Sequence, residues 1–224
     1  MERHFDEQLQ ALKLQLTKMS ALAETMIADA VKAVVQRDES AIPVVYRREE
    51  QVNQLQIEID EMCLTLIALH QPAAGDLRFI MGAAKTNSDL ERLADQAVNI
   101  CNKAERLLTE PPLKPFVIIP EMATIARGMV RDSLHAFVDR DVARARDVVL
   151  RDDQLDQRKA QITEQLAGYM AQDPSSVSRA LDLVLIACNL ERIGDHATNI
   201  GENTIFVVEG RDIRHHAEEK KTPA

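Results

Sequence analysis

A twelve-residue stretch occurs twice in this chain, 100 residues apart. Residues 89–100 read DLERLADQAVNI and residues 189–200 read NLERIGDHATNI, with seven identical positions. Such a repeat constrains the fold more than any other feature, and its period is too long for one unit of a solenoid. The sequence therefore predicts a duplicated half-molecule in which each half contributes the same structure once.

Each half is predicted to contain three helices. Apolar residues spaced three and four apart mark amphipathic helices at about residues 4–37, 41–70, 76–109, 121–138, 142–171 and 176–208. Ser40 is the expected N-cap of the second helix. The predicted fold is all-α, with two tandem antiparallel three-helix bundles related by internal duplication. The bundles span residues 1–110 and 121–210, with a proline-rich linker at 111–120 and a charged tail at 211–224.

Net charge, cysteine placement and the length of apolar runs argue against several classes of protein. The net charge of −9 argues against nucleic-acid binding, which needs a basic face to neutralise phosphates. Cys63, Cys101 and Cys188 lack metal-ligand spacing, so we expect reduced core residues of a cytoplasmic protein. No apolar run approaches the roughly 20 residues that span a bilayer, and the N-terminus lacks the shape of a signal peptide.

The repeated stretch divides into three sectors on a helical wheel. One sector contains Leu90 and Ala97 and is predicted to face the core. A second contains Asp89 and Gln96 and is predicted to be solvated, as is the side toward which His196 points. The third carries short oxygen-bearing side chains stacked along the helix: Glu91, Asp95, Asn99 and Asn102 in the first half, and Glu191, Asp195, Asn199 and Glu202 in the second.

The stacked acidic residues predict a cation site. Like charges four residues apart destabilise a helix by roughly 0.2–0.5 kcal/mol, so we expect a compensating cation. The second helix of each half offers a matching pair, Glu49 with Asn53 and Asp152 with Asp156. Oxygen ligands suit a hard or borderline cation, alone or in a multinuclear cluster. In the alternative interpretation the motif carboxylates pair with Arg or Lys side chains of neighbouring helices, and the candidates are Arg47, Arg48, Arg151 and Arg158.

Two other classes remain open. A carboxylate-bridged di-metal oxidase requires a Glu-x-x-His pair on each of two helices, and the nearest match is Asp132 with His135. A metal-free structural helical protein is the third reading. The sequence lacks a nucleophile elbow, a phosphate-binding loop and a dinucleotide glycine pattern, so we expect no enzymatic activity.

The chain resembles the PhoU family of bacterial regulators of phosphate uptake and phosphate signalling. The resemblance rests on QPAAGDLR at 71–78, ERLAD and ERIGD ending at Asp95 and Asp195, and GRDIRH at 210–215. It implies metal clusters, with iron or zinc expected before manganese or magnesium. Carried over by position, the ligands are Glu49, Glu91, Asp95, Asp152, Asp156, Glu191 and Asp195. Because Asn53 departs from the acidic pattern, we expect the first site to be weaker.

The resemblance also implies a regulatory role. PhoU-like proteins are negative regulators that connect a phosphate ABC importer, through its ATPase subunit, to a sensor histidine kinase. They keep the phosphate-starvation response off when phosphate is plentiful. On this resemblance we expect a homodimer that works at the cytoplasmic face of the membrane through protein partners.

Overall fold

The computed structural model describes residues 2–113 and 117–213. These form six long helices: α1 (Glu2–Val35), α2 (Ile42–His70), α3 (Ala74–Leu108), α4 (Ile118–Asp139), α5 (Val142–Gln172) and α6 (Val177–Glu209). Short 3-10 helices, η1 (Glu39–Ala41) and η2 (Pro174–Ser176), precede α2 and α6. The described residues contain no strand, which confirms the all-α prediction. Most of the predicted charged tail lies outside the described residues.

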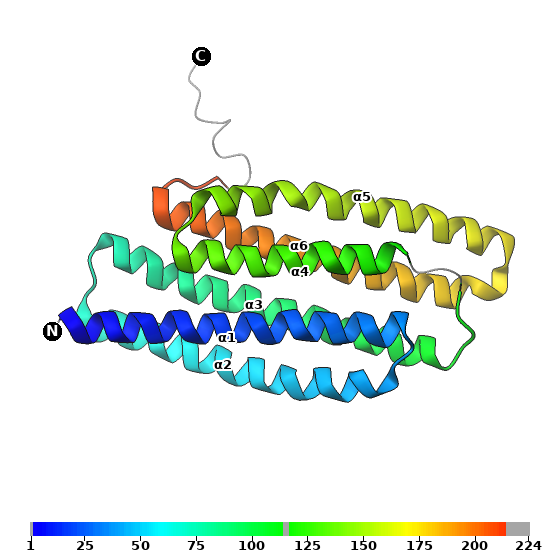
Figure 1. Ribbon diagram of the computed structural model, residues 1–224, viewed down its shortest axis with the longest axis horizontal. Coiled ribbons are helices and arrows are strands. Elements are labelled where there is room, and N and C mark those ends of the chain that lie inside the picture. Colours follow the sequence, from blue (N-terminus) through cyan, green and yellow to red (C-terminus); the bar gives the residue numbers. More distant parts are fainter. Residues whose placement is uncertain (1, 114–116, 214–224) are drawn as a thin grey trace, which may run out of the picture.

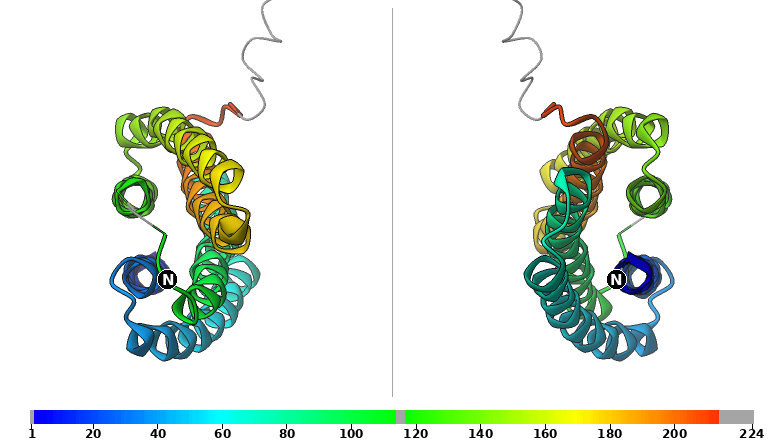
Figure 2. Two further views of the ribbon diagram at one scale, coloured as in Figure 1. Left: turned by 90° about the vertical axis from the view of Figure 1, so that its right-hand side faces the viewer. Right: turned by 90° about the vertical axis from the view of Figure 1, so that its left-hand side faces the viewer.

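The helices form two antiparallel three-helix bundles, α1–α3 and α4–α6, as predicted (Figure 1). The bundles lie side by side, with α3 packed against α6 and α1 against α4. Viewed end-on in Figure 2, α1 and α4 occupy one side, α3 and α6 the other, and α2 and α5 the two remote edges. Both copies of the repeated motif are therefore on neighbouring helices. Within the part of the chain that is described, no helix is long and apolar enough to span a membrane.

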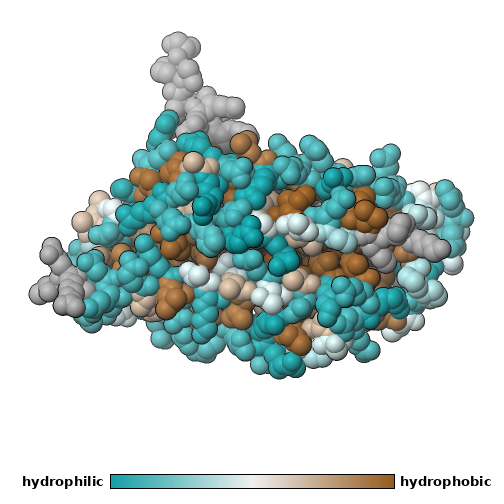
Figure 3. All heavy atoms as spheres, viewed as in Figure 1, coloured by the Kyte–Doolittle hydropathy of each residue, from teal (hydrophilic) through white to brown (hydrophobic). Residues whose placement is uncertain are grey.

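The face formed by α1 and α4 is mainly hydrophilic, with scattered apolar side chains (Figure 3). The opposite side of the molecule is formed by α3 and α6 (Figure 2). We call the solvent-facing side of these two helices the outer face. Both copies of the acidic motif lie on these two helices.

Close helix packing holds α5 against α6 at the second motif. Leu190 and Ile193 are fully buried, as the apolar spacing predicts. Gly194 follows them, and a side-chain carbon there would collide with Leu155 and lie 3.3 Å from Asp152 Oδ1. The absence of a side chain at Gly194 therefore lets α5 bring its acidic residues close to those of α6.

Two local details differ from the sequence-based expectation. Ser40 is not the N-cap of α2, because it lies inside η1 and α2 begins after Ala41, which has no capping side chain. The N-cap of η1 is Asp38, whose Oδ1 accepts a hydrogen bond from the Ser40 amide at 3.1 Å. Helix α4 begins at Ile118, three residues earlier than expected. Pro120 fits into its first turn, because proline's missing N–H is not needed there.

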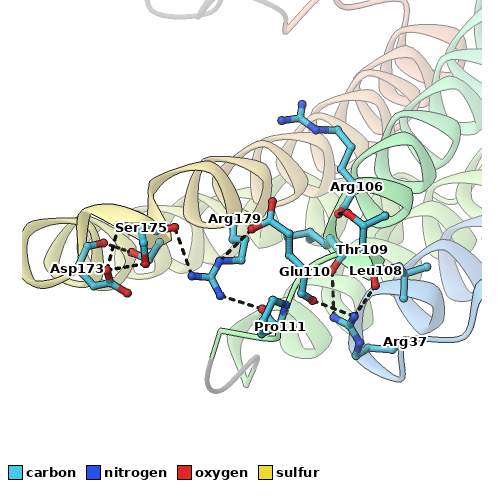
Figure 4. Close-up of polar contacts among 11 residues, drawn as sticks. Arg37, Arg106, Leu108, Thr109, Glu110, Pro111, Asp173, Ser175 and Arg179 are labelled. Atoms are coloured by element: carbon cyan, nitrogen blue, oxygen red, sulfur yellow. Dashed lines mark hydrogen bonds and ion pairs between the residues drawn. The ribbon is translucent and has the colours of Figure 1, made fainter.

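Two arginines, one from each half, fix the chain where the first half ends (Figure 4). Arg37 adopts a left-handed backbone conformation with φ of 55°. Its guanidinium donates to the carbonyls of Leu107, Leu108 and Glu110 at 2.7 to 3.0 Å. Arg179 of α6 donates to the Pro111 carbonyl at 3.0 Å. The Leu107 carbonyl also accepts from the Glu110 backbone amide at 3.3 Å. Together these bonds tie the chain that leaves α3 to both halves.

Candidate metal centre

The two copies of the motif meet at the seam between α3 and α6. The carboxylate oxygen Oδ1 of Asp89 lies 3.0 Å from His196 Nδ1 and accepts a hydrogen bond from the Asn199 amide at 3.3 Å. Gln96, on the same side of α3, is only 8% exposed. The expectation that this sector is solvated is therefore wrong for Asp89 and Gln96, whereas Lys85 and Arg92 of the same sector are exposed. When only one helix is considered, its polar side could face water or could face the polar side of the helix that carries the other copy of the motif.

The second half gathers four of the predicted ligands, Asp152 and Asp156 of α5 with Glu191 and Asp195 of α6. Partial burial, followed by the Asp195 and Asp156 carboxylates, raises the pKa of Asp152 to about 6. Partial burial and then the charges of Glu191 and Asp156 also raise the pKa of Asp195. The negative charges of these four residues therefore act on Asp152 and Asp195, and the four side chains form an acidic patch.

The most enclosed oxygen of this patch belongs to Asp152. Its Oδ1 atom is buried and has no hydrogen-bond partner among the described residues. The Thr198 hydroxyl lies close enough to lower the pKa of Asp152, but it too is buried without a partner in hydrogen-bonding geometry. A buried carboxylate oxygen without a donor is unfavourable, and a cation would satisfy it.

Lysine 159 supplies one positive charge to the patch. Its Nζ atom lies 2.7 Å from Glu191 Oε1. The sequence reasoning missed this residue, although the signal was present: Asp152, Asp156 and Lys159 occupy i, i+4 and i+7 on one face of α5.

The first half gathers three predicted ligands, Glu49 of α2 with Glu91 and Asp95 of α3. Partial burial and then the Asp95 charge raise the pKa of Glu91, with a smaller contribution from Glu49. Arg92 lies 3.6 Å from Glu91 and 3.3 Å from Asp95. The side chain of Asn53 donates to Glu49 Oε1 at 3.1 Å, so this position supplies a donor where the second half has a carboxylate.

Arginines of the neighbouring helices form ion pairs with carboxylates outside the repeated motif. Arg48 pairs with Asp29, Arg151 with Asp132 at 2.7 Å, and Arg158 with Glu121 at 3.3 Å. These three arginines therefore do not pair with the motif carboxylates. Lys159 of α5 does pair with Glu191 of α6, as the alternative interpretation allows, and Arg92 lies beside Glu91 and Asp95 on their own helix. Asp132, which with His135 is the nearest match to a di-metal oxidase motif, forms an ion pair with Arg151.

Donor chemistry in the second half fits a hard or borderline cation, because Asp152 has an unsatisfied buried oxygen and interacts electrostatically with three further carboxylates. Across residues 2–113 and 117–213, however, no three Asp, Glu, His or Cys side chains converge closely enough to hold a metal ion. Coordination would require side-chain rotation and release of Glu191 by Lys159. The ligand roles of all seven residues stay predictions.

Known proteins share this architecture. A family model described as "PhoU domain" matches residues 16–104 and again residues 119–204. A phosphate-specific transport system accessory protein PhoU homolog from Pseudomonas putida is 37% identical over 216 residues, covering 96% of this chain and 84% of that protein. The homolog from Aquifex aeolicus is 39% identical over 215 residues, covering 96% and 97%.

Solved structures agree with the sequence comparisons. The crystal structure of PhoU from Pseudomonas aeruginosa matches with a TM-score of 0.89 and 34% identity, covering 92% of this chain and 100% of that chain. The structure of the phosphate transport system regulatory protein PhoU from Streptococcus pneumoniae matches with a TM-score of 0.86 and 25% identity, covering 93% and 99%. The match of the family model to both halves and these full-length similarities lead to one conclusion: this chain belongs to the PhoU family.

Proposed function

We propose that this protein is a negative regulator of phosphate uptake and of the phosphate-starvation response. It acts without catalysis, as an adaptor between the ATPase subunit of a phosphate ABC importer and a sensor histidine kinase at the cytoplasmic face of the membrane. Family membership supports an accessory role, since relatives are named accessory proteins of the phosphate-specific transport system. We further propose that the working form is a homodimer.

One observation carries the adaptor role: apolar side chains are exposed at equivalent positions of both repeats. These residues are Leu77, Met81, Val177 and Leu181, each between 37% and 49% exposed. Leu77 and Val177 precede Asp95 and Asp195 by 18 residues, which is about five turns, so they share a side of their helix with those carboxylates. Because α3 and α6 run antiparallel, with Gly82 beside Asn203 and Arg106 beside Asp182, the two pairs lie at opposite ends of the outer face. Each pair is an exposed apolar contact point of the kind that protein-binding surfaces use.

The outer face also offers a hollow between its two helices. The hollow measures about 640 Å³ and is bordered by Ser88 of α3 and by Asp195 and Asn199 of α6. The acidic residues and the apolar ends of both helices thus open to the same side. We propose that the importer and the kinase contact this face.

We propose cation binding in the same region, by iron or zinc before manganese or magnesium. The first site would use Glu49, Glu91 and Asp95; the second would use Asp152, Asp156, Glu191 and Asp195. Positive charge there would cancel the carboxylate repulsion described above and tie α2 to α3 and α5 to α6. It would thereby stiffen the helices that form the partner-binding face.

The regulatory role is tested by complementation of a strain that lacks its own copy of the protein. A reporter of the phosphate-starvation response should be active in phosphate-rich medium without the protein and silent when the protein is restored. Met81→Glu and Leu181→Glu should lose this repression at unchanged protein level. Leu14→Glu, at a 69% exposed position on α1, is the matched control and should retain it.

Two results would count against the proposal. A reporter that stays silent without the protein would exclude negative regulation. Loss of repression by Leu14→Glu, equal to that of Leu181→Glu, would exclude the outer face as the specific contact surface.

A further inference from the structure

We propose that the first-half end of the outer face continues onto α2 and binds a basic amphipathic helix of a partner protein. The inference rests on the partner contact proposed above for the outer face, and it names the chemistry of one partner segment. It adds two residues of α2, Ile57 and Leu64, to the apolar pair of α3, Leu77 and Met81. The side chains of Ile57 and Leu64 are 55% and 68% exposed.

A hydrogen bond between α2 and α3 fixes where these side chains lie. The Asn87 amide of α3 donates to Asp60 Oδ1 of α2 at 3.0 Å. Ile57 and Leu64 are three residues before and four residues after Asp60, so they share the side of α2 that borders α3. Leu64 and Met81 are four and six residues from this bond in the same direction, because the two helices run antiparallel. Only about 3 Å therefore separates Leu64 and Met81 along the helix axis.

The four apolar residues thus form a row along the border between α2 and α3. From Ile57 to Leu77 the row spans about 20 Å, which is the length of a helix of about 13 residues. Side chains three, four and seven residues apart on a partner helix present a matching apolar stripe. The length and the shape of the row therefore fit one helical segment.

The charge beside this row is negative. Between residues 49 and 69, α2 carries five acidic residues and has no lysine or arginine. Two of them, Asp60 and Glu61, lie between Ile57 and Leu64 in the sequence and are exposed. The apolar side chains of α2 therefore have carboxylates on their rim.

The basic residues of this part of α3 are turned toward α6. Arg78 Nε donates to the Val207 carbonyl at 3.3 Å. Lys85 Nζ lies 5.7 Å from the centroid of the Phe206 ring. Both cations are therefore on the side of α3 away from α2, and they leave the carboxylates of α2 to act on whatever approaches the row.

A basic amphipathic helix matches both properties of this surface. Its apolar side would cover the row, and its lysines or arginines would reach Asp60 and Glu61 at the rim. A second copy of this chain matches less well, because a two-fold interface brings the same patch of both subunits together. Asp60 and Glu61 would then face like charges, which is unfavourable.

The internal repeat shows that the first half alone offers this surface. An offset of 103 residues relates α2 to α5. At this offset Ala160 corresponds to Ile57, and α5 has Lys159 beside it. Ala167 corresponds to Leu64. Alanine offers far less apolar area than leucine or isoleucine, so the two ends of the outer face differ in the segment that they bind.

Photo-crosslinking in cells tests the proposal. The photoreactive residue p-benzoyl-phenylalanine replaces Leu64 in the full-length protein, in a strain that lacks its own copy. The matched control carries the same residue in place of Leu150 of α5, which is 71% exposed. After irradiation in phosphate-rich medium, mass spectrometry identifies the peptide that is linked at each position.

The peptide captured at position 64 should come from another protein and carry a net positive charge, with apolar residues three and four apart. Glu61→Lys should lower its yield about fivefold, because an attractive rim charge is replaced by a repulsive one. Glu164→Lys, at the corresponding position of α5, should keep the yield within about twofold, since it lies outside the row.

Four results would overturn the proposal: an acidic or neutral captured peptide, a peptide from a second copy of this chain, a yield at position 64 no greater than at position 150, or a yield unchanged by Glu61→Lys. The proposed function is judged at another position. If only the α2 surface is wrong, p-benzoyl-phenylalanine in place of Leu181 should still capture a partner. If neither position captures one and the reporter stays silent without the protein, the proposed function fails as well.

Discussion

The imidazole of His196 on α6 lies 3.0 Å from the Asp89 carboxylate on α3, measured from Nδ1 to Oδ1. This contact joins the two copies of the repeated motif across the seam of the molecule. Asn199 donates to the same oxygen at 3.3 Å. One carboxylate of the first half thus receives two polar groups of the second, and the orientation of the two acidic patches depends on it.

We therefore expect Asp89→Ala to loosen the seam. Removing the carboxylate leaves the groups of His196 and Asn199 without their acceptor, at an expected loss of about 1 kcal/mol in the free energy of unfolding. Urea denaturation measures the loss. Asp147→Ala is the control, because that side chain is 65% exposed and its pair with Arg151 should contribute less than about 0.5 kcal/mol. Equal losses from both substitutions would argue against a special role for the seam contact.

Arg37 should be irreplaceable by lysine. Its guanidinium reaches three carbonyls at the end of the first half, and an ammonium cannot reproduce that planar fork. We expect Arg37→Lys to lower the free energy of unfolding by about 1–2 kcal/mol. Arg47→Lys, at an exposed position of α2, should leave it unchanged. Denaturant midpoints of the two variants test this, and matching midpoints would contradict it.

Two glycines of the second half should respond oppositely to alanine. A side chain at Gly194 would meet Leu155, so Gly194→Ala should push α5 from α6 and lower stability by about 1–3 kcal/mol. Gly168, also within a helix, has no atom within 4 Å of such a side chain. Gly168→Ala should raise stability by up to about 1 kcal/mol, through helix propensity. Thermal unfolding should show a lower melting temperature for Gly194→Ala and a higher one for Gly168→Ala. A lower melting temperature for Gly168→Ala would contradict the prediction.

The acidic patch should make stability depend on pH in chelator. The pKa of Asp152 is about 6 in the folded chain, against an ordinary value of 3.8. Protonated Asp152 is favoured in the folded chain, so its stabilising contribution is fully present below about pH 4. That contribution is lost as the pH rises through about 6 and the carboxyl group ionises. We expect Asp152→Asn to be more stable than the unsubstituted protein at pH 7.5 by about 1 kcal/mol, a value reduced for solvent screening. The gain should shrink as the pH falls from 6 and vanish only below about pH 4, and a gain independent of pH would refute the repulsion argument.

Much of this fold could be predicted from the repeat and the apolar spacing. Leu90 and Leu190 follow a helical period into the core, and the duplication correctly implied two similar bundles. The seam could not be predicted, because Asp89 and Gln96 look like ordinary solvated residues when only one helix is considered. The N-cap expected at Ser40 was wrong, because Ser40 lies inside the 3-10 turn that Asp38 caps and α2 begins after Ala41. Small local differences of this kind are decided by backbone conformation, which residue type alone does not determine.

The candidate site was predicted in outline only. Spacing of four residues placed Asp152 with Asp156, and Glu191 with Asp195, on single helix faces. Their approach across α5 and α6 depends on the missing side chain at Gly194, a packing effect between helices. Lys159 is absent from the predicted site because a pattern of metal-ligand residues does not include the cations that pair with them.

The metal content of tag-free protein purified without chelator tests the central claim most directly. Plasma mass spectrometry of the unsubstituted chain should find at least one iron or zinc per chain. Glu191→Gln combined with Asp195→Asn should lose the metal of the second half. Less than about a tenth of an equivalent of iron, zinc, manganese and magnesium in the unsubstituted protein, unchanged by those substitutions, would contradict the account.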